Sequence, residues 1–316
     1  MQMLKSFLPL SLFACSAALC SAAQLSSDAK SAIPRDVQQI ISVDYRAMQN
    51  SSAAMELKDR VLPPELKRLE RALKTSGLKV DDDADVLTFA AFRENAASQG
   101  SHIIGVAQGQ FHTREIMANF AKNKVKPTTL RNNSIYPMGS NGMSVAFLNQ
   151  TTMVFGDHTS LQAALDARDG VAPNFLQNSD MANEMLSVEQ RAVWSLLDQK
   201  GTQTMMRSVL GDASQLADYD TVRTRMKSSR YTMDFQNGVK FDMAVVMSDT
   251  MTAATCATLL KGVSLLKKTQ GNPLEKSALD QTTIDSSAGT LTVSYSSSDS
   301  QFASLLTSPL FQSVVR

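Results

Sequence analysis

The chain is poor in cysteine, histidine and tryptophan: its 316 residues include three cysteines, three histidines and one tryptophan. Cys15 and Cys20 lie within the first 23 residues, so the rest of the chain keeps only Cys256. A single cysteine excludes an intramolecular disulfide and a thiolate metal cluster. The histidines lack the H-E-x-x-H spacing of a zinc site. We therefore expect no metal and no cofactor.

Long apolar runs are also missing, and the one at the start of the chain is short. A charged start (Met1–Lys5), an apolar stretch (Ser6–Cys20) and small residues (Ser21-Ala22-Ala23) follow one another. These are the three parts of a cleavable secretory signal peptide, whereas a membrane span needs about 20 apolar residues. We predict a signal peptide over residues 1–23, and no transmembrane segment after cleavage. Lipid attachment at Cys15 is an alternative, since Leu12-Phe13-Ala14-Cys15 resembles a lipobox.

No charge of one sign dominates. The chain has 31 basic and 30 acidic residues, and Lys5 is the only charge in the predicted signal, so the mature 293 residues carry 30 of each. Nucleic-acid binders usually concentrate a basic surplus on one face, and we expect no nucleic-acid partner. The hydrophobic content of 43% is normal for a globular protein of one large domain or two ordinary ones.

The predicted elements follow the same order in two halves of the chain. The first half reads as strand 36–44, helical stretch 46–75, strands 85–93 and 102–111, helix 113–124, strands 134–138, 143–149 and 152–155, and helix 159–167. The second half reads as strand 189–198, helical stretch 202–226, strands 229–236 and 239–247, helix 250–267, strands 282–286 and 290–296, and helix 300–307. Asn237-Gly238 is a strong two-residue hairpin signal.

Strands joined by hairpins form antiparallel sheets. The sequence therefore predicts an α+β fold of two similar halves, each an antiparallel sheet with helices packed on one face. We predict a first repeat over residues 24–170, a linker over 171–188 whose later part is a short helix, and a second repeat over 189–316.

Structural glycines and strand patterns mark several segments: Ile33-Pro-Arg-Asp-Val, Gly77-Leu78 leading to Asp85-Val86, Gly105–Phe111, Thr152–Asp157 with the following helix Leu161–Arg168 and Gly170, and the strand around Trp194. These segments resemble a family of exported bacterial proteins of unknown function that is frequent in acidobacterial and related genomes. The resemblance covers nearly the whole mature chain and implies a periplasmic or secreted bacterial protein. It assigns no catalytic residues.

The candidate catalytic residues are few. His112 and Glu115 stand three residues apart at a predicted helix start, and Asp157-His158 follows a predicted strand end. An acid beside a histidine is the minimum for general acid–base catalysis, so a secreted hydrolase with a dispersed site is one hypothesis. It requires one of these histidines to lie near both an acid and a serine in one pocket. Asp157 fits equally well as the N-cap of the following helix.

The leading hypothesis is different, because the sequence contains no nucleophile elbow, P-loop or dinucleotide-binding motif. We expect an exported, non-enzymatic protein that binds or scaffolds at the cell envelope, with an unknown protein or glycan as its partner. A third hypothesis is an export or assembly helper that holds a client strand at a sheet edge.

Overall fold

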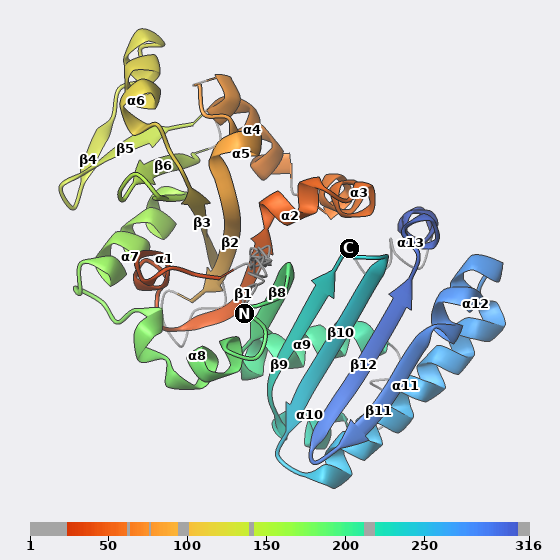
Figure 1. Cartoon of the computed structure of the whole chain (residues 1–316). Coiled ribbons are helices and arrows are strands. Elements are labelled where there is room, and N and C mark those ends of the chain that lie inside the picture. The colour runs from red at the N-terminus through yellow and green to blue at the C-terminus, as the bar shows by residue number, and fades with distance from the viewer. Residues whose placement is uncertain are drawn as a thin grey trace, which may run out of the picture.

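The computed structural model describes residues 24–61, 64–75, 77–93, 101–138, 142–211 and 219–308 (Figure 1). The predicted signal peptide, with Cys15, lies outside the described residues. The first half contains α1 (Ser27–Ser31), β1 (Val37–Asp44), α2 (Tyr45–Gln49), α3 (Ser52–Val61), α4 (Pro64–Thr75), α5 (Val80–Asp83), β2 (Ala84–Phe92), β3 (His102–Gly109), α6 (Thr113–Lys122), β4 (Thr128–Leu130), β5 (Asn133–Pro137), β6 (Ser144–Phe147), β7 (Thr152–Gly156) and α7 (His158–Arg168).

A connecting segment and the second half follow. The segment contains η1 (Phe175–Gln177) and α8 (Ser179–Met185). The second half contains β8 (Val193–Leu197), α9 (Gln199–Leu210), α10 (Tyr219–Thr224), β9 (Met226–Asp234), β10 (Val239–Met247), α11 (Thr250–Gln270), α12 (Pro273–Asp280), β11 (Thr282–Ser287), β12 (Thr290–Ser297) and α13 (Asp299–Leu306).

The described strands form one sheet of 12 strands in the order β11-β12-β10-β9-β8-β1-β2-β3-β7-β6-β5-β4. β1 and β8 pair antiparallel at the junction of the two halves, with Gln39 opposite Leu197 and Val43 opposite Val193. The predicted α+β class with antiparallel pairing is confirmed. The two halves share a single continuous sheet, and their origin by duplication stays a prediction.

The first half has helices on both faces of the sheet. Val154 of β7 packs in one core with Leu165 of α7, and its neighbour Phe155 packs in another core with Phe120 of α6. Because successive strand residues point to opposite faces, these two cores lie on opposite sides of the sheet. Helices therefore cover both faces of this half, so the predicted packing of helices on one face is wrong for the first half.

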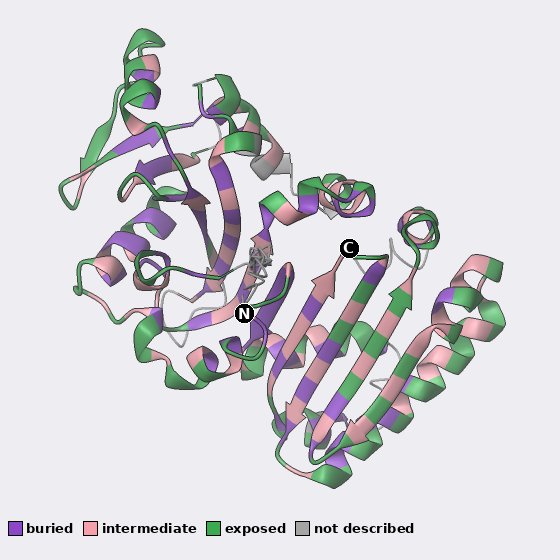
Figure 2. Cartoon of the chain, viewed as in Figure 1, coloured by how far each residue is buried: buried purple, intermediate pink, exposed green. Residues whose placement is uncertain are grey.

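The second half has its helices on one face. Val245 of β10 and Leu291 of β12 pack with Cys256 and Leu260 of α11 and with Met206 of α9. In Figure 1 the strands β9 to β12 face the viewer and α9 and α11 lie behind them. Exposed residues alternate with partly buried ones along β11 and along most of β12, as Figure 2 shows. We call the uncovered side of β9, β10, β12 and β11 the open face.

The segment between the halves is packed rather than solvated. Its later part forms the short helix α8, as predicted. Phe175, Met181, Met185 and Val188 are buried in the same core as Trp194 of β8. The later part of the segment thus covers β8, and β9, the next strand, belongs to the open face.

Most predicted elements are present, with shifted ends. The strand predicted over 189–198 is limited to β8, and the helical stretch predicted over 202–226 includes the first residue of β9. α9 ends at Leu210, and its C-cap Gly211 has a φ of 52°, which glycine adopts without steric cost. Asn237 and Gly238 both adopt positive φ, 59° and 101°, which confirms the tight hairpin between β9 and β10.

Candidate functional site

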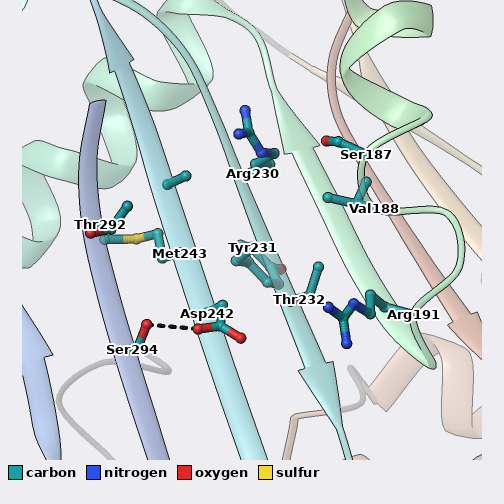
Figure 3. Close-up of a pocket in the computed structure, with 11 residues that line it drawn as sticks. Ser187, Val188, Arg191, Arg230, Tyr231, Thr232, Asp242, Met243, Thr292 and Ser294 are labelled. Atoms are coloured by element: carbon teal, nitrogen blue, oxygen red, sulfur yellow. Dashed lines mark hydrogen bonds between the residues drawn. The ribbon is translucent and has the colours of Figure 1, made fainter. Parts of the chain in front are cut away.

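A shallow pocket of about 230 Å³ lies on the open face (Figure 3). Its floor is formed by side chains of β9, β10 and β12, and its wall by Ser187, Val188 and Arg191 of the segment that precedes β8. The pocket therefore lies at the boundary between the part of the sheet that the segment before β8 covers and the open face.

Two ion pairs hold the wall against the floor. Arg230 of β9 reaches back to Glu184 of α8, with 2.5 Å between Nη1 and Oε2. Arg191 pairs with Asp234 at 2.9 Å, and the N–H of Ala192 donates to the same carboxylate at 3.3 Å. Partly exposed ion pairs contribute about 0–1 kcal/mol each. Their main effect is to fix the position of the wall and to neutralise both guanidinium groups.

The floor is built from rows of residues that face one another across the strands. The strand registers place Thr232, Asp242, Ser294 and Thr283 in one row, which we call the Asp242 row. The next row on the same face is Arg230, Ala244, Thr292 and Asp285. Neighbouring strands lie about 4.8 Å apart, so each row presents side-chain groups at that spacing.

Asp242 is the exposed carboxylate of the pocket floor. Its Oδ1 accepts a hydrogen bond of 2.7 Å from the Ser294 hydroxyl, drawn as a dashed line in Figure 3. The described residues that line the pocket include no histidine and no cysteine. The arrangement can donate and accept hydrogen bonds, and the hydroxyl of Ser294 is paired with the carboxylate of Asp242.

The predicted site residue Asp157 is a helix cap. Its Oδ1 accepts a 2.7 Å hydrogen bond from the backbone N–H of Ser160, so it begins α7 as the N-cap. His102 lies nearby, with 3.9 Å between its Nδ1 and Oδ2 of Asp157. The sequence did not predict this contact, because it depends on the pairing of β3 with β7. Ser160 is fully buried, which keeps its hydroxyl from any substrate in solvent.

The other predicted site residues lie elsewhere. His112 precedes α6 with a 70% exposed side chain, and its Nδ1 is 3.9 Å from Asp83. Glu115 and His158 are exposed in the first turns of α6 and α7. The antiparallel pairing of β3 and β7 puts His112 and Asp157 at opposite ends of β3, about 26 Å apart for an eight-residue strand. The four predicted residues therefore do not converge on one pocket.

Comparison with known proteins reveals a likeness of fold. No family model and no curated protein matches the chain. The structure of TP0453 in crystal form III matches with a TM-score of 0.51 at 10% identity, and covers 88% of this chain and 96% of that chain. The chain is similar in fold to TP0453. Crystal form I of TP0453 matches with a TM-score of 0.49 at 9% identity, covering 88% of this chain and 95% of that chain.

Cys256 and the possible metal ligands are the other reactive groups of the described residues. Burial raises the pKa of the Cys256 thiol to about 11, so it stays protonated and unreactive at neutral pH. No group of three potential metal ligands occurs within the described ranges. Among the helices of the described residues, none combines the length and the apolar character that crossing a membrane requires.

Proposed function

We propose that the chain is an exported, non-enzymatic protein that binds or scaffolds a partner at the cell envelope, and that the partner lies on the open face. The observation that carries this proposal is the difference between the halves. Helices cover both faces of the sheet in the first half, whereas no helix of the described residues covers the second face of β9, β10, β12 and β11.

The chemistry of the open face supports a binding role. Asp242, Thr292 and Ser294 are exposed there, and the pocket beside them has a wall fixed by ion pairs. A site that is formed before its ligand arrives loses less conformational entropy on binding. The features of a signal peptide in residues 1–23 and the resemblance to exported bacterial proteins support the placement outside the cytoplasm.

The alternative of a secreted hydrolase is not favoured by the geometry. It requires a histidine, an acid and an accessible serine together, and the described residues bring Asp157 only to His102 and a buried Ser160.

At the β11 edge of the sheet, the alternative of a client strand is opposed by a side-chain hydrogen bond. β11 is one of the two terminal strands, and Ser287 faces Thr290 across a two-residue turn. In this type of hairpin that pair is hydrogen-bonded, so the N–H of Ser286 points away from β12. The Asp285 carboxylate accepts this N–H at 2.7 Å. A donor that an added strand would use is already occupied.

The binding role is tested by affinity capture from envelope extract with the mature chain, residues 24–316, as bait. The variant Ser294→Arg places a bulky cation in the centre of the open face. The control Thr258→Arg adds the same side chain on the exposed side of α11. We expect a retained protein or glycan that is lost with the first variant and kept with the second. Retention of nothing, or equal retention by both variants, would contradict the proposal.

The export part is tested separately, by sequencing the N-terminus of the protein from a fractionated bacterial host. We expect a periplasmic or secreted chain that begins at Gln24. An uncleaved chain in the cytoplasm would contradict the predicted signal peptide.

A further inference from the structure

The open face carries short polar side chains in rows rather than a single cluster. The Asp242 row presents two threonines, an aspartate and a serine, and the adjacent row adds an arginine, a threonine and a second aspartate. Five of these residues, Asp242, Ser294, Thr283, Thr292 and Asp285, are exposed. Because the strands are about 4.8 Å apart, hydrogen-bonding groups repeat at this interval across β9, β10, β12 and β11.

The charges around the pocket are compensated. The guanidinium groups of Arg230 and Arg191 face the carboxylates of Glu184 and Asp234. Asp242 and Asp285 add two carboxylates, which accept hydrogen bonds from the Ser294 hydroxyl and the Ser286 N–H. Lys240, exposed in the row beside Asp242, adds one ammonium group, so the face keeps a net charge of about one negative unit. A polyanion would meet no surplus of positive charge, and a polycation would meet little negative charge. The face therefore favours a ligand without net charge.

The face also offers little apolar surface. Apolar side chains of its two central rows are limited to Ala244, which is partly buried. Peptides are usually held by pockets for their apolar side chains or by hydrogen bonds to a strand edge. The rows provide no such pockets, and the edge donor at Ser286 is occupied by Asp285. A ligand on this face would therefore be bound mainly through polar groups that donate and accept hydrogen bonds.

We propose that the open face binds a neutral oligosaccharide that lies across the strands, along the Asp242 row. This rests on the proposed binding function. Each sugar hydroxyl both donates and accepts a hydrogen bond, and a sugar ring is about as wide as the spacing between two strands. Asp242 accepts from sugar hydroxyls, and such bonds to a charged group are stronger than neutral ones. Thr232, Ser294 and Thr283 supply hydroxyls on both sides of it.

The experiment is calorimetric titration of the mature chain with three neutral linear probes: cellohexaose, chitohexaose and maltohexaose. We expect at least one to bind with a Kd of about 1 mM or tighter. Asp242→Asn removes the charge while its amide oxygen still accepts the Ser294 hydroxyl, so the fold is kept. This variant is expected to weaken binding about tenfold, the effect of losing one charge-assisted hydrogen bond. Asp59→Asn, the same change at an exposed site on α3, is expected to leave the Kd unchanged.

Amide chemical shifts of the isotope-labelled chain give a second measurement. Binding along the Asp242 row is expected to move the signals of Asp242, Ser294 and Thr283 and to leave those of α3 in place. The proposal is overturned if none of the three hexaoses binds at hexaose concentrations up to about 10 mM. It is also overturned if a hexaose binds Asp242→Asn with the same Kd as the unmodified chain. If the envelope capture retains a protein in a Ser294-dependent manner while no hexaose binds, the binding function stands and the oligosaccharide does not.

Discussion

Gly105→Ala tests the packing of the first half, because this glycine makes room for an aromatic ring. Gly105 of β3 lies opposite Phe155 of β7. A Cβ atom at this position would be 2.1 Å from Cε2 and Cζ of Phe155, whereas carbon atoms pack at about 3.5–4.0 Å. The Phe155 ring must therefore move by about 1.5 Å. It is 5% exposed and meets Phe89 edge to face at 5.9 Å, so it has little space to enter.

The expected loss of stability follows from three contributions. Overpacking costs about 1–3 kcal/mol, and disturbing the ring pair with Phe89 adds about 0.5–1.5 kcal/mol. Alanine regains about 0.5–1 kcal/mol of backbone entropy relative to glycine. Gly105→Ala should therefore lower the free energy of unfolding by about 1–3 kcal/mol, which appears as a lower guanidinium midpoint.

A matched control makes the same change where there is space. Gly262 lies in α11, and no atom is within 4 Å of a Cβ added there. Gly262→Ala is expected to raise the free energy of unfolding by about 0.5–1 kcal/mol, the helix preference of alanine over glycine. The double variant Gly105→Ala/Phe155→Leu should regain part of the loss, since the smaller side chain leaves room for the added methyl group. Equal midpoints for Gly105→Ala and the unmodified chain would refute the packing argument.

Three further predictions concern other parts of the molecule. Trp194 is the single tryptophan of the chain and fully buried, so its fluorescence should resist acrylamide quenching in the folded state and shift to the red on unfolding; ready quenching of the native chain would show that the junction of the halves is open. Hydrogen bonds from the backbone N–H and the hydroxyl of Thr252 hold the pKa of Asp249 well below its ordinary value of 3.8. The Asp249 cap therefore stabilises the fold above pH 3.8 and loses this effect as the pH falls further. The difference in urea midpoint between the unmodified chain and Asp249→Asn should shrink below that pH, and a constant difference would contradict this. Asp285→Ala frees the edge N–H of Ser286 and should increase self-association in sedimentation velocity. A sedimentation coefficient equal to that of the unmodified chain would show that Asp285 does not protect the edge.

Local patterns in the sequence predicted most of the individual elements. Asn237-Gly238 fixed the hairpin of β9 and β10, since both residues tolerate positive φ, and the predicted strand 239–247 coincides with β10. The polar alternation along β12 likewise indicated a half-buried strand. β4 was not predicted, because three residues are too few to show a periodic pattern.

The candidate site was not predictable in the same way. Its rows depend on the register of four strands, and its wall comes from the segment before β8, so no single stretch of sequence contains the pocket. The sequence suggested the histidines as candidates for a catalytic site that the structure does not contain among its described residues. His112 and His158 each stand near an acid in the sequence, yet the pairing of β3 with β7 places them at opposite ends of a strand. Each histidine lies near an acid because both belong to the start of a helix, and the two helix starts do not share a pocket.

The pairing of β1 with β8 has a consequence for the order in which the chain acquires its structure. The side chain of Gln39 in β1 donates a hydrogen bond to the hydroxyl of Ser195 in β8, 156 residues further along the chain. At a synthesis rate of about 5–20 residues per second, β1 waits roughly 8–30 s for the strand that will pair with its second edge. During that interval an apolar strand edge is open to wrong partners. The edge of β1 is therefore protected late in synthesis, when β8 has emerged from the ribosome.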